Sequence, residues 1–521
     1  MARYLKYLDF VIFPILAIYA VHLFTWYGGV GISPDSIMYT SAARSLQSSG
    51  SLITFNNTPI TDFPVFYPIF LWSVLATTGV DPFAAGPVLN ELIFAAVVVL
   101  TGLITVRFRP TSHVYRWLIL ATMVLSPALL EVYSYLWSET LFILVILIFF
   151  FACHQYFQRR TISALLIFAL VAALSSITRY AGVTLIGTGG LLLLLDLKPP
   201  LKRRIQDLFI YGFVSISFLV LNLARNIMDT GRLTGPRETS FTPFAKNVYY
   251  FGTVICDWLG LTDKSYSYAP VITYLIFAGL IALLIINFRK KKLGSFENIA
   301  VMFAFVYGAF IIISSTFSRY ERINTRLLSP MYIALLLSCT YWVISIIKSL
   351  QQKTKYALTG LACLLMIGFC YQEYLTAHER YEGEGEYGVP GFTDDSWNKS
   401  PFAEYLKKDK SLFKPGVPIY SDANEALYFL SGDKVKLLPH RYFRNTIQAF
   451  YKVPHYYLVW FDSMDNPELI SLKDIIKVEN LKLLKKFDTG TTEDGIINGA
   501  IYEYDSLDNP TLKESDNKQN P

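Results

Sequence analysis

Long apolar runs follow one another along the chain as far as about residue 373, and short polar segments separate them. A bilayer core of about 30 Å is crossed by a helix of about 20 apolar residues. The runs predict about eleven transmembrane helices, at 9–28, 85–106, 115–132, 139–157, 161–178, 181–196, 207–224, 270–288, 297–316, 327–347 and 355–373. A shorter stretch, 65–79, contains Pro68 and indicates a re-entrant or interfacial segment, with a twelfth span as the alternative.

Basic residues in the short loops predict which side of the membrane each loop faces. Most of them fall on one side of the predicted bundle: Arg3, Lys6, Arg107, Arg109, Arg159, Arg160, Lys198, Lys202, Arg203, Arg204, Arg289, Lys290, Lys291, Lys292, Lys348, Lys353 and Lys355. Because Lys and Arg collect in cytoplasmic loops, this pattern predicts a cytoplasmic N-terminus. An odd number of spans then places the C-terminal domain outside. We expect a multi-pass protein of the bacterial inner, or plasma, membrane with a periplasmic or extracellular C-terminal domain.

The pattern changes after residue 373. Residues 379–396 are acidic and rich in glycine, which predicts a linker. From residue 397 onward, short runs of aromatic and β-branched residues such as HYYLVWF predict strands. We therefore predict an α-helical polytopic membrane bundle at 1–378, with a large first outer loop at 29–84, and an α/β or α+β extracytoplasmic domain at 397–521.

The composition agrees with burial in lipid. The chain is 53% hydrophobic and 17% charged, whereas an ordinary soluble domain is about 25% charged. The sequence contains no CxxC, no P-loop, no HExxH and no GxGxxG after a predicted strand. We therefore expect neither a nucleotide cofactor nor a nucleic-acid partner.

A first candidate for chemistry lies where the first span ends, in GISPDSIMY. Ser33 suits an N-cap and Pro34 suits the first helical position, so a short amphipathic helix is expected to begin here. Asp35 would lie in its first turn, one turn before Tyr39. The carboxylate either stabilises the helix dipole or acts as a general base at the membrane surface, and the pattern leaves both readings open.

A second candidate carboxylate is Glu139, in YLWSETLF. Ser138 could cap the following span, which would place Glu139 in the first turn. A charge at the mouth of an apolar helix is costly unless it faces a polar cavity, although a dipole role is again the alternative. Glu131 is a less favoured candidate for the same position.

Arginines on the predicted outer face run against the positive-inside bias. Arg179 follows one span, and Arg322 and Arg326 precede another. A guanidinium group binds phosphate through a planar fork of donors, so these three are candidate phosphate-binding residues. Each could instead be solvated or paired with a carboxylate.

The segment TDFPVFYPIF, at 61–70, places Asp62 and Tyr67 among aromatic residues and prolines. It predicts either a rigid cavity wall or an ordinary interfacial aromatic belt. Together with Tyr39 and Tyr180, these residues are our candidates for lining a cavity and binding an acceptor.

Several of these segments, in chain order, resemble the lipid-linked sugar transferases of the GT-C superfamily. They are SPDSIMY, TDFPVFYP, YLWSETLF, TRYAG and NTRLLSP. The chain looks most like glycosyltransferase family 39, which includes protein O-mannosyltransferases and the aminoarabinose transferases that modify lipid A. PIYSDANEALYFLSGDKVKLLPH, at 418–440, also resembles the outer domain of bacterial members.

The resemblance implies that Asp35 is the catalytic aspartate and that Glu139 is the second acidic position, which in relatives binds a metal or orients the acceptor. A divalent metal of unspecified identity at Glu139 is therefore a candidate cofactor. Arg179 and Arg326 match positions that hold the lipid phosphate. Eukaryotic mannosyltransferases have Asp-Glu in the first loop, whereas Ser36 follows Asp35 here, so the acceptor stays open among lipid, glycan and protein.

The resulting hypothesis is a membrane glycosyltransferase that moves a sugar from a polyprenyl-phosphate donor to an acceptor on the outer face, with inversion. Asp35 would take the acceptor proton, and the arginines would stabilise the leaving phosphate. We expect Asp35 and Glu139 to share one polar pocket. The alternatives are a polysaccharide polymerase or ligase that uses lipid-linked sugars, a lipid or sugar transporter, and a scaffold without catalytic activity.

Overall fold

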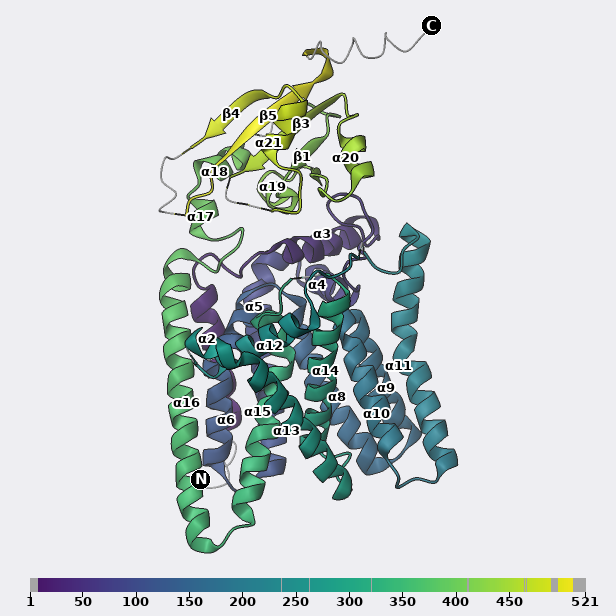
Figure 1. Ribbon diagram of the computed structural model, residues 1–521, viewed down its shortest axis with the longest axis vertical. Helices are drawn as coiled ribbons and strands as arrows, with labels where there is room; N and C mark the ends of the chain where they lie inside the picture. The colour runs from purple at the N-terminus through teal and green to yellow at the C-terminus, as the bar shows by residue number, and fades with distance from the viewer. Residues whose placement is uncertain are drawn as a thin grey trace. The chain divides into compact units, whose positions relative to one another are not determined.

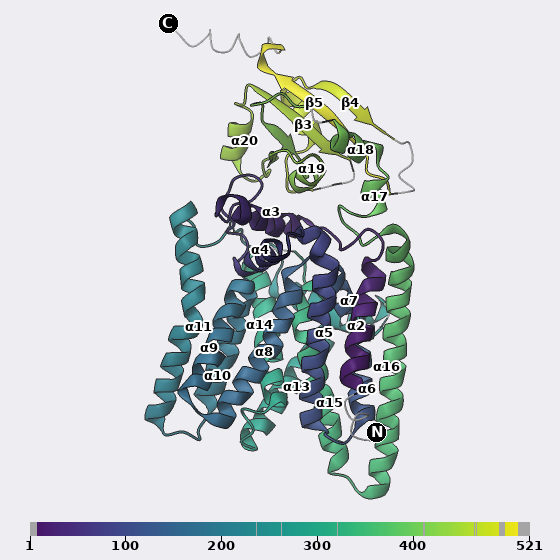
Figure 2. The ribbon, with the colours of Figure 1, turned by 180° about the vertical axis from the view of Figure 1, so that it is seen from behind.

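The chain divides into two compact units in the computed structural model, which describes residues 8–235, 237–261, 263–319, 321–409, 412–462, 464, 466–488 and 495–508. The helical unit comprises Met1–Trp26 and Pro59–Glu386, and the sheet unit comprises Tyr27–Thr58 and Tyr387–Pro521. Figure 1 labels the elements of both units, and Figure 2 gives the view from behind. The predicted boundaries at 378 and 396 remain predictions.

The helical unit consists of helices that mostly run side by side (Figures 1 and 2). They are α2 (Asp9–Thr25), α4 (Phe66–Thr78), α5 (Pro82–Phe108), α6 (His113–Leu125), α7 (Pro127–Ser134), α8 (Ser138–Arg159), α9 (Ile162–Thr178), α10 (Val183–Leu195), α11 (Leu201–Thr230), α12 (Phe244–Trp258), α13 (Ala269–Arg289), α14 (Phe296–Phe317), α15 (Thr325–Lys348) and α16 (Gln352–Tyr387). Within the described ranges, seven helices are long and apolar enough to cross a membrane, and the bent pair α6–α7 would make an eighth. The predicted polytopic helical fold is confirmed, while the count of about eleven spans stays a prediction.

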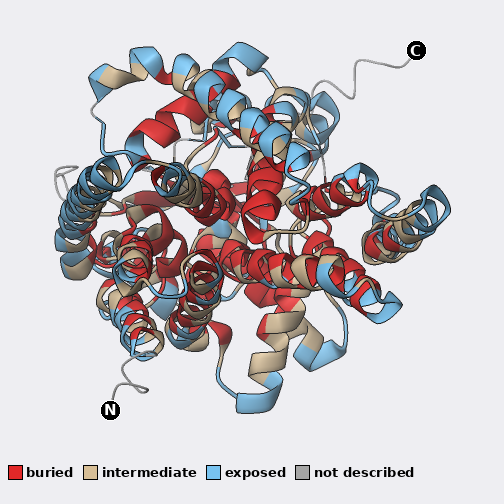
Figure 3. Ribbon diagram, turned by 90° about the horizontal axis from the view of Figure 1, so that it is seen from below, coloured by how far each residue is buried: buried red, intermediate tan, exposed pale blue. Residues whose placement is uncertain are grey.

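The outer helices expose apolar surface that is stable only in lipid. The most apolar window of the segment Asp263–Arg289, which contains α13, has a mean hydropathy of 2.6, yet only 17% of it is buried. None of the corresponding window of α16 is buried. Figure 3 shows buried residues toward the middle of the bundle and exposed residues on its outer helices. Because soluble proteins rarely expose apolar patches of this extent, these faces contact the bilayer.

Local sequence signals set several helix ends. The Asp81 side chain accepts a hydrogen bond from the backbone N–H of Phe83 at 3.0 Å and caps α5. Thr161 caps α9, and Asn324 caps α15, in the same way. Pro127 begins α7 and cannot donate a backbone hydrogen bond, so the chain bends by 49° between α6 and α7.

Two helices differ from the sequence prediction. Helix α12 lies between the predicted spans 207–224 and 270–288, where no helix was predicted, and its Phe251 and Cys256 are fully buried. It is amphipathic, which hides it from a search for continuous apolar runs. Helix α16 continues past the predicted end at 373 to Tyr387, and a 2.5 Å ion pair between Arg380 and Glu384 supports the added turns.

The sheet unit is built on a five-stranded mixed sheet in the order β2-β1-β3-β5-β4. Its strands are β1 (Ile419–Ser421), β2 (Val435–Leu437), β3 (His455–Phe461), β4 (Lys482–Phe487) and β5 (Gly499–Asp505). Strand β1 pairs in parallel with β2 and β3, whereas β5 pairs antiparallel with β3 and β4. The helices of this unit are α3 (Pro34–Ser49), α17 (Asp395–Asn398), α18 (Pro401–Lys408), α19 (Asn424–Ser431), α20 (Arg444–Phe450) and α21 (Leu472–Val478). The predicted mixed α and β domain is confirmed.

Part of the first outer loop packs within the sheet unit. The backbone N–H of Phe392 donates to the carbonyl of Ile32 at 2.9 Å. Gly391 has a φ of 140°, and a Cβ there would collide with the Ile32 backbone, so only glycine suits this approach. The rings of Phe55 and Tyr428 stack at 4.4 Å. Helix α3, which carries Asp35, is therefore held by contacts to the C-terminal part of the chain.

Candidate functional site

Glu139 lies in the first turn of α8, and its side chain is 1% exposed. A carboxylate in this position interacts favourably with the positive end of the helix dipole. The dipole alone is worth at most about 2 kcal/mol, which is less than the several kcal/mol needed to bury an ion. The partners of Glu139 therefore decide whether its charge can be kept.

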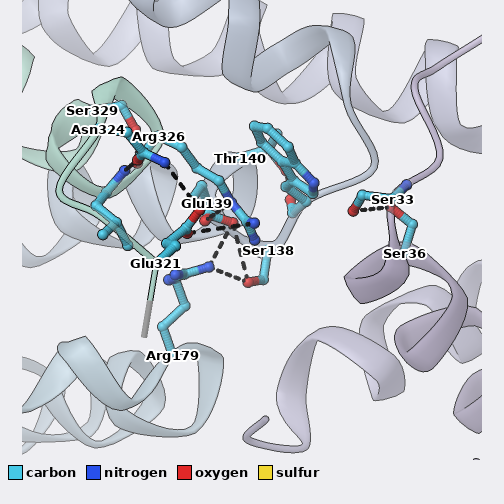
Figure 4. Close-up of polar contacts among 12 residues, drawn as sticks. Ser33, Ser36, Ser138, Glu139, Thr140, Arg179, Glu321, Asn324, Arg326 and Ser329 are labelled. Atoms are coloured by element: carbon cyan, nitrogen blue, oxygen red, sulfur yellow. Dashed lines mark hydrogen bonds and ion pairs between the residues drawn. The ribbon is translucent and has the colours of Figure 1, made fainter. Parts of the chain in front are cut away.

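Two arginines from different helices reach Glu139 (Figure 4). Arg326, in the first turn of α15, donates from Nε to one carboxylate oxygen at 2.6 Å. Arg179, immediately after α9, places Nη1 2.5 Å from the other oxygen and donates to the Ser138 hydroxyl at 2.7 Å. The structure thus brings together three residues that the sequence singled out. Arg326 Nη1 also lies 3.8 Å from the carboxylate of Glu321, whose side chain is 42% exposed. The two guanidinium groups present donors that suit an anionic group such as phosphate.

The turn between α7 and α8 packs against the guanidinium group of Arg326. That guanidinium lies 4.2 Å from the centroid of the Trp137 ring, and Trp137 stacks on Tyr135 at 4.0 Å. Asn90 of α5 fixes the turn by donating to the carbonyls of Tyr133 and Tyr135 at 2.9 and 2.8 Å. The sequence analysis did not identify Trp137 or Asn90, because neither belongs to a charged motif.

The remaining residues predicted to line a cavity divide between two places. Tyr67 of α4 hydrogen-bonds to Thr140 and lies within electrostatic range of Glu139. Tyr180 directly follows Arg179, and its hydroxyl donates to the carbonyl of Thr61 at 3.0 Å. Tyr67 therefore lies beside the cluster, whereas the Tyr180 hydroxyl lies at the Thr61 backbone.

Asp62 is exposed and directly follows Thr61, whose carbonyl accepts the hydrogen bond from Tyr180. The N–H of Gly235 donates to the carbonyl of Thr61 at 3.2 Å, and a Cβ at Gly235 would meet the Asp62 carboxylate. Asn226 donates to the Tyr180 hydroxyl at 3.2 Å. Asp62 and Tyr180 thus share one polar neighbourhood.

Arg322, the third predicted phosphate-binding residue, lies in a different environment. Its guanidinium lies 4.2 Å from the centroid of the Tyr250 ring. It lines a polar cavity of about 460 Å³ together with Glu131, Asp257 and Glu321. Among the described contacts, none joins Arg322 to Glu139.

Asp35 lies in the first turn of α3, as the Ser-Pro-Asp pattern predicted. Ser33 is the N-cap, and its backbone N–H donates to the Ser36 hydroxyl at 3.1 Å in a capping box. Asp35 is half-buried and Tyr39 is buried. Asp35 belongs to the sheet unit and Glu139 to the helical unit, and the pocket expected to join them stays a prediction.

The neighbour of Asp35 within the sheet unit is a second carboxyl group. Helix α19 contacts α3, and Glu425 of α19 lies within electrostatic range of Asp35. Burial raises the pKa of Glu425, and the negative charge of Asp35 raises it further. The sequence analysis missed Glu425, although it stands in the PIYSDANEALYF segment that carried the resemblance.

The residues around Glu139 do not suit a divalent metal in this arrangement. Both carboxylate oxygens are engaged by guanidinium groups, which would repel a cation. Over the part of the chain that the structure describes, no group of three or more His, Cys, Asp and Glu side chains could hold a metal ion. A metal bound at Glu139 stays a prediction from the resemblance.

The fold defines the class of protein: a polytopic helical membrane protein with an additional mixed α and β unit. The particular matches are solved structures of ArnT from Cupriavidus metallidurans, in the apo state and bound to undecaprenyl phosphate. Each has a TM-score of 0.57, with 13% and 12% sequence identity, 95% of this chain covered, and 98% and 97% of the ArnT chain covered. The resemblance read from the motifs is confirmed for the fold.

A more distant match is the archaeal oligosaccharyltransferase AglB from Archaeoglobus fulgidus, in complex with an inhibitory peptide and a dolichol-phosphate. Its TM-score is 0.51 at 10% identity, over 98% of this chain and 75% of AglB. No family model matches the sequence, and no curated protein matches it. The likeness therefore lies in the architecture rather than in the sequence.

Proposed function

We propose that the chain is a membrane glycosyltransferase that moves a sugar from a polyprenyl-phosphate donor to an acceptor hydroxyl group on the outer face. The observation that carries this proposal is the pair of guanidinium groups, from Arg179 and Arg326, held around the buried carboxylate of Glu139. It is supported by the fold shared with ArnT, a protein solved with undecaprenyl phosphate bound.

The arginine cluster serves the leaving group in this proposal. When the bond between the anomeric carbon and the phosphate oxygen breaks, its electron pair stays on the phosphate. Arg179 and Arg326 stabilise the developing charge with donors that are already in place. Glu139 acts as a positioning residue, because both of its oxygens are used to hold the guanidinium groups.

Asp35 serves the acceptor. Its carboxylate takes the proton from the acceptor hydroxyl, whose oxygen forms the new bond to the anomeric carbon. A single displacement from the face opposite the phosphate inverts the configuration at that carbon. Tyr39, Asp62, Tyr67 and Tyr180 are the proposed contacts for the sugar and acceptor.

The test begins with the acceptor, because the sequence leaves it open. Mass analysis of lipid A, glycan and protein fractions from cells with and without the gene identifies the modified product. Transfer by purified wild-type and Asp35→Asn protein is then measured with a polyprenyl-phosphate sugar. We expect the variant to lose about 10²–10⁴-fold in rate, the usual contribution of a general base.

Asp81→Asn is the matched control, since Asp81 is also a carboxylate at a helix start but caps α5. It should transfer sugar at the wild-type rate. Near-normal transfer by a folded Asp35→Asn protein would exclude the general-base role. Absence of transfer from every polyprenyl-phosphate sugar tested would overturn the proposed donor.

The likeness to AglB supports a second candidate, an enzyme that transfers preassembled lipid-linked glycans. Such an enzyme, or a polymerase or ligase, would prefer an oligosaccharide on a pyrophosphate carrier. The two proposals are separated by comparing monophosphate and pyrophosphate donors at equal concentration. A transporter would instead move a lipid-linked sugar across vesicles without forming a new glycosidic bond.

A further inference from the structure

A second charged cavity lies at the opposite end of the helical unit from Glu139. It has a volume of about 680 Å³ and is formed by the ends of α8, α10 and α13 and the start of α14. Helix α8 carries Glu139 in its first turn, and its last turn, together with the following residue Arg160, lines the cavity. At 1.5 Å per residue, roughly 30 Å separates the two ends, which is the thickness of a bilayer core.

The charges of the cavity are mostly positive. Five basic and two acidic side chains line it, which leaves a formal charge of +3. Arg160 pairs with Asp196, whose side chain is 3% exposed. Lys292 lies 3.7 Å from Glu297 and donates to the Tyr341 hydroxyl at 3.0 Å. These pairs fix two of the cations in the wall.

The other three cations, Lys198, Arg289 and Lys291, are exposed. In the described parts of the chain no ion pair is recorded for any of them. They project from three different segments: the α10–α11 connection, the end of α13 and the α13–α14 turn. An anion that enters the cavity can therefore gain charge-assisted hydrogen bonds without breaking an existing pair.

Apolar side chains adjoin these cations in the same cavity. Leu197 is 66% exposed and Phe288 is 40% exposed, and both line it. Leu195 adds a third partly exposed apolar surface. A soluble phosphate would leave these groups in water, whereas a ligand with both a phosphate and hydrocarbon chains would cover them.

We propose that this cavity binds the phosphate headgroup of an anionic phospholipid, with Lys198, Arg289 and Lys291 as the headgroup contacts. Leu197 and Phe288 pack against the upper part of its acyl chains. Basic pockets between transmembrane helices bind acidic lipids in this way. The site is separate from the proposed transfer chemistry and does not depend on it.

The test measures lipid binding to the purified full-length protein by native mass spectrometry, with dioleoylphosphatidylglycerol and dioleoylphosphatidylcholine as probes. Wild-type protein should bind phosphatidylglycerol more tightly. The double variant Lys198→Ala/Lys291→Ala should bind it at least about tenfold more weakly, since each basic residue near an anionic lipid contributes about fivefold. Binding of phosphatidylcholine should not change.

The matched control is Lys353→Ala/Lys355→Ala, which removes two lysines from the first turn of α16 and leaves the cavity intact. It should bind phosphatidylglycerol like the wild type. Equal losses in both double variants would show a diffuse charge effect and overturn the site. Equal wild-type affinity for the two lipids would also overturn it. Complete displacement of phosphatidylglycerol by millimolar glycerol 3-phosphate would assign the cavity to a soluble phosphate instead.

Discussion

Three buried carboxylates of the helical unit and two of the sheet unit differ in whether a cation accompanies them. In the helical unit, Asp9, Asp196 and Glu139 are buried and each is paired with arginine. In the sheet unit, Asp422 and Glu479 are buried, and no ion pair is recorded for either among the described residues. Burial raises the pKa of each of these two carboxyl groups to about 7. These three carboxylates of the helical unit thus have cationic partners, whereas burial without such a partner favours the protonated form of Asp422 and Glu479.

This difference bears on the two candidate acidic residues. Glu139 lies between two guanidinium groups that engage both of its carboxylate oxygens. Asp35 has another carboxyl group, Glu425, as its neighbour within the sheet unit. Under the proposed function, these environments suit a positioning role for Glu139 and leave the general-base role to Asp35.

The largest effect on stability is expected for Glu139→Gln. The substitution leaves Arg179 and Arg326 next to each other without the anion between them. Removing one partner of a buried ion pair costs about 3–5 kcal/mol. Thermal unfolding of the purified protein, followed by tryptophan fluorescence, should show a clear drop in the midpoint.

Glu131→Gln is the control for this measurement, because Glu131 lines a polar cavity and makes no recorded ion pair with an arginine in the described structure. It should change the midpoint much less. Equal unfolding midpoints for the Glu139→Gln and Glu131→Gln proteins would show that the ion pairs of Glu139 with the two arginines do not stabilise the bundle.

A smaller effect is expected for Arg326→Lys. Lysine keeps the charge but lacks the planar fork of donors and the stacking on Trp137, whose ring centroid lies 4.2 Å from Cζ of Arg326. We expect kcat/KM for the polyprenyl-phosphate donor to fall about tenfold, the effect of losing roughly one charge-assisted hydrogen bond. Arg319→Lys, at an arginine that pairs with Glu238 at 2.7 Å, should leave this constant unchanged. The opposite ranking would remove Arg326 from the donor site.

The sequence predicted most of the helices because a continuous apolar run is a local signal. The predicted span 139–157 corresponds to α8 (Ser138–Arg159), and 297–316 corresponds to α14 (Phe296–Phe317). Helix α12 escaped prediction because its apolar face is discontinuous along the sequence, and it is stabilised by tertiary packing. The bend at Pro127 was hidden in one apolar run.

The candidate site was predicted only where a charge stood out against an apolar or outer segment. Glu139, Arg179 and Arg326 carried that signal, and the structure brings them together. Their convergence depends on the packing of α8, α9 and α15, which no local pattern encodes. Glu425 gave no such signal, because a glutamate in the first turn of a surface helix is ordinary.

The smallest expected effect concerns pH and the sheet unit. Asp422 and Glu479 have pKa values of about 7 in the folded protein, above the ordinary carboxyl range. Between about pH 4 and 7 the folded unit binds more protons than the unfolded chain, so its stability must fall as the pH rises through this window. Hydrogen exchange of β3 in the full-length protein, corrected for intrinsic rates, should show less protection at pH 8 than at pH 5.

The variant Asp422→Asn tests the cause. It keeps a side-chain oxygen that can accept from the Phe461 N–H, which lies 3.1 Å from Oδ1 of Asp422, and it should remove part of the loss of protection at high pH. An unchanged pH dependence in the variant would show that Asp422 is ionised in the folded protein and that the contrast between the units does not hold there.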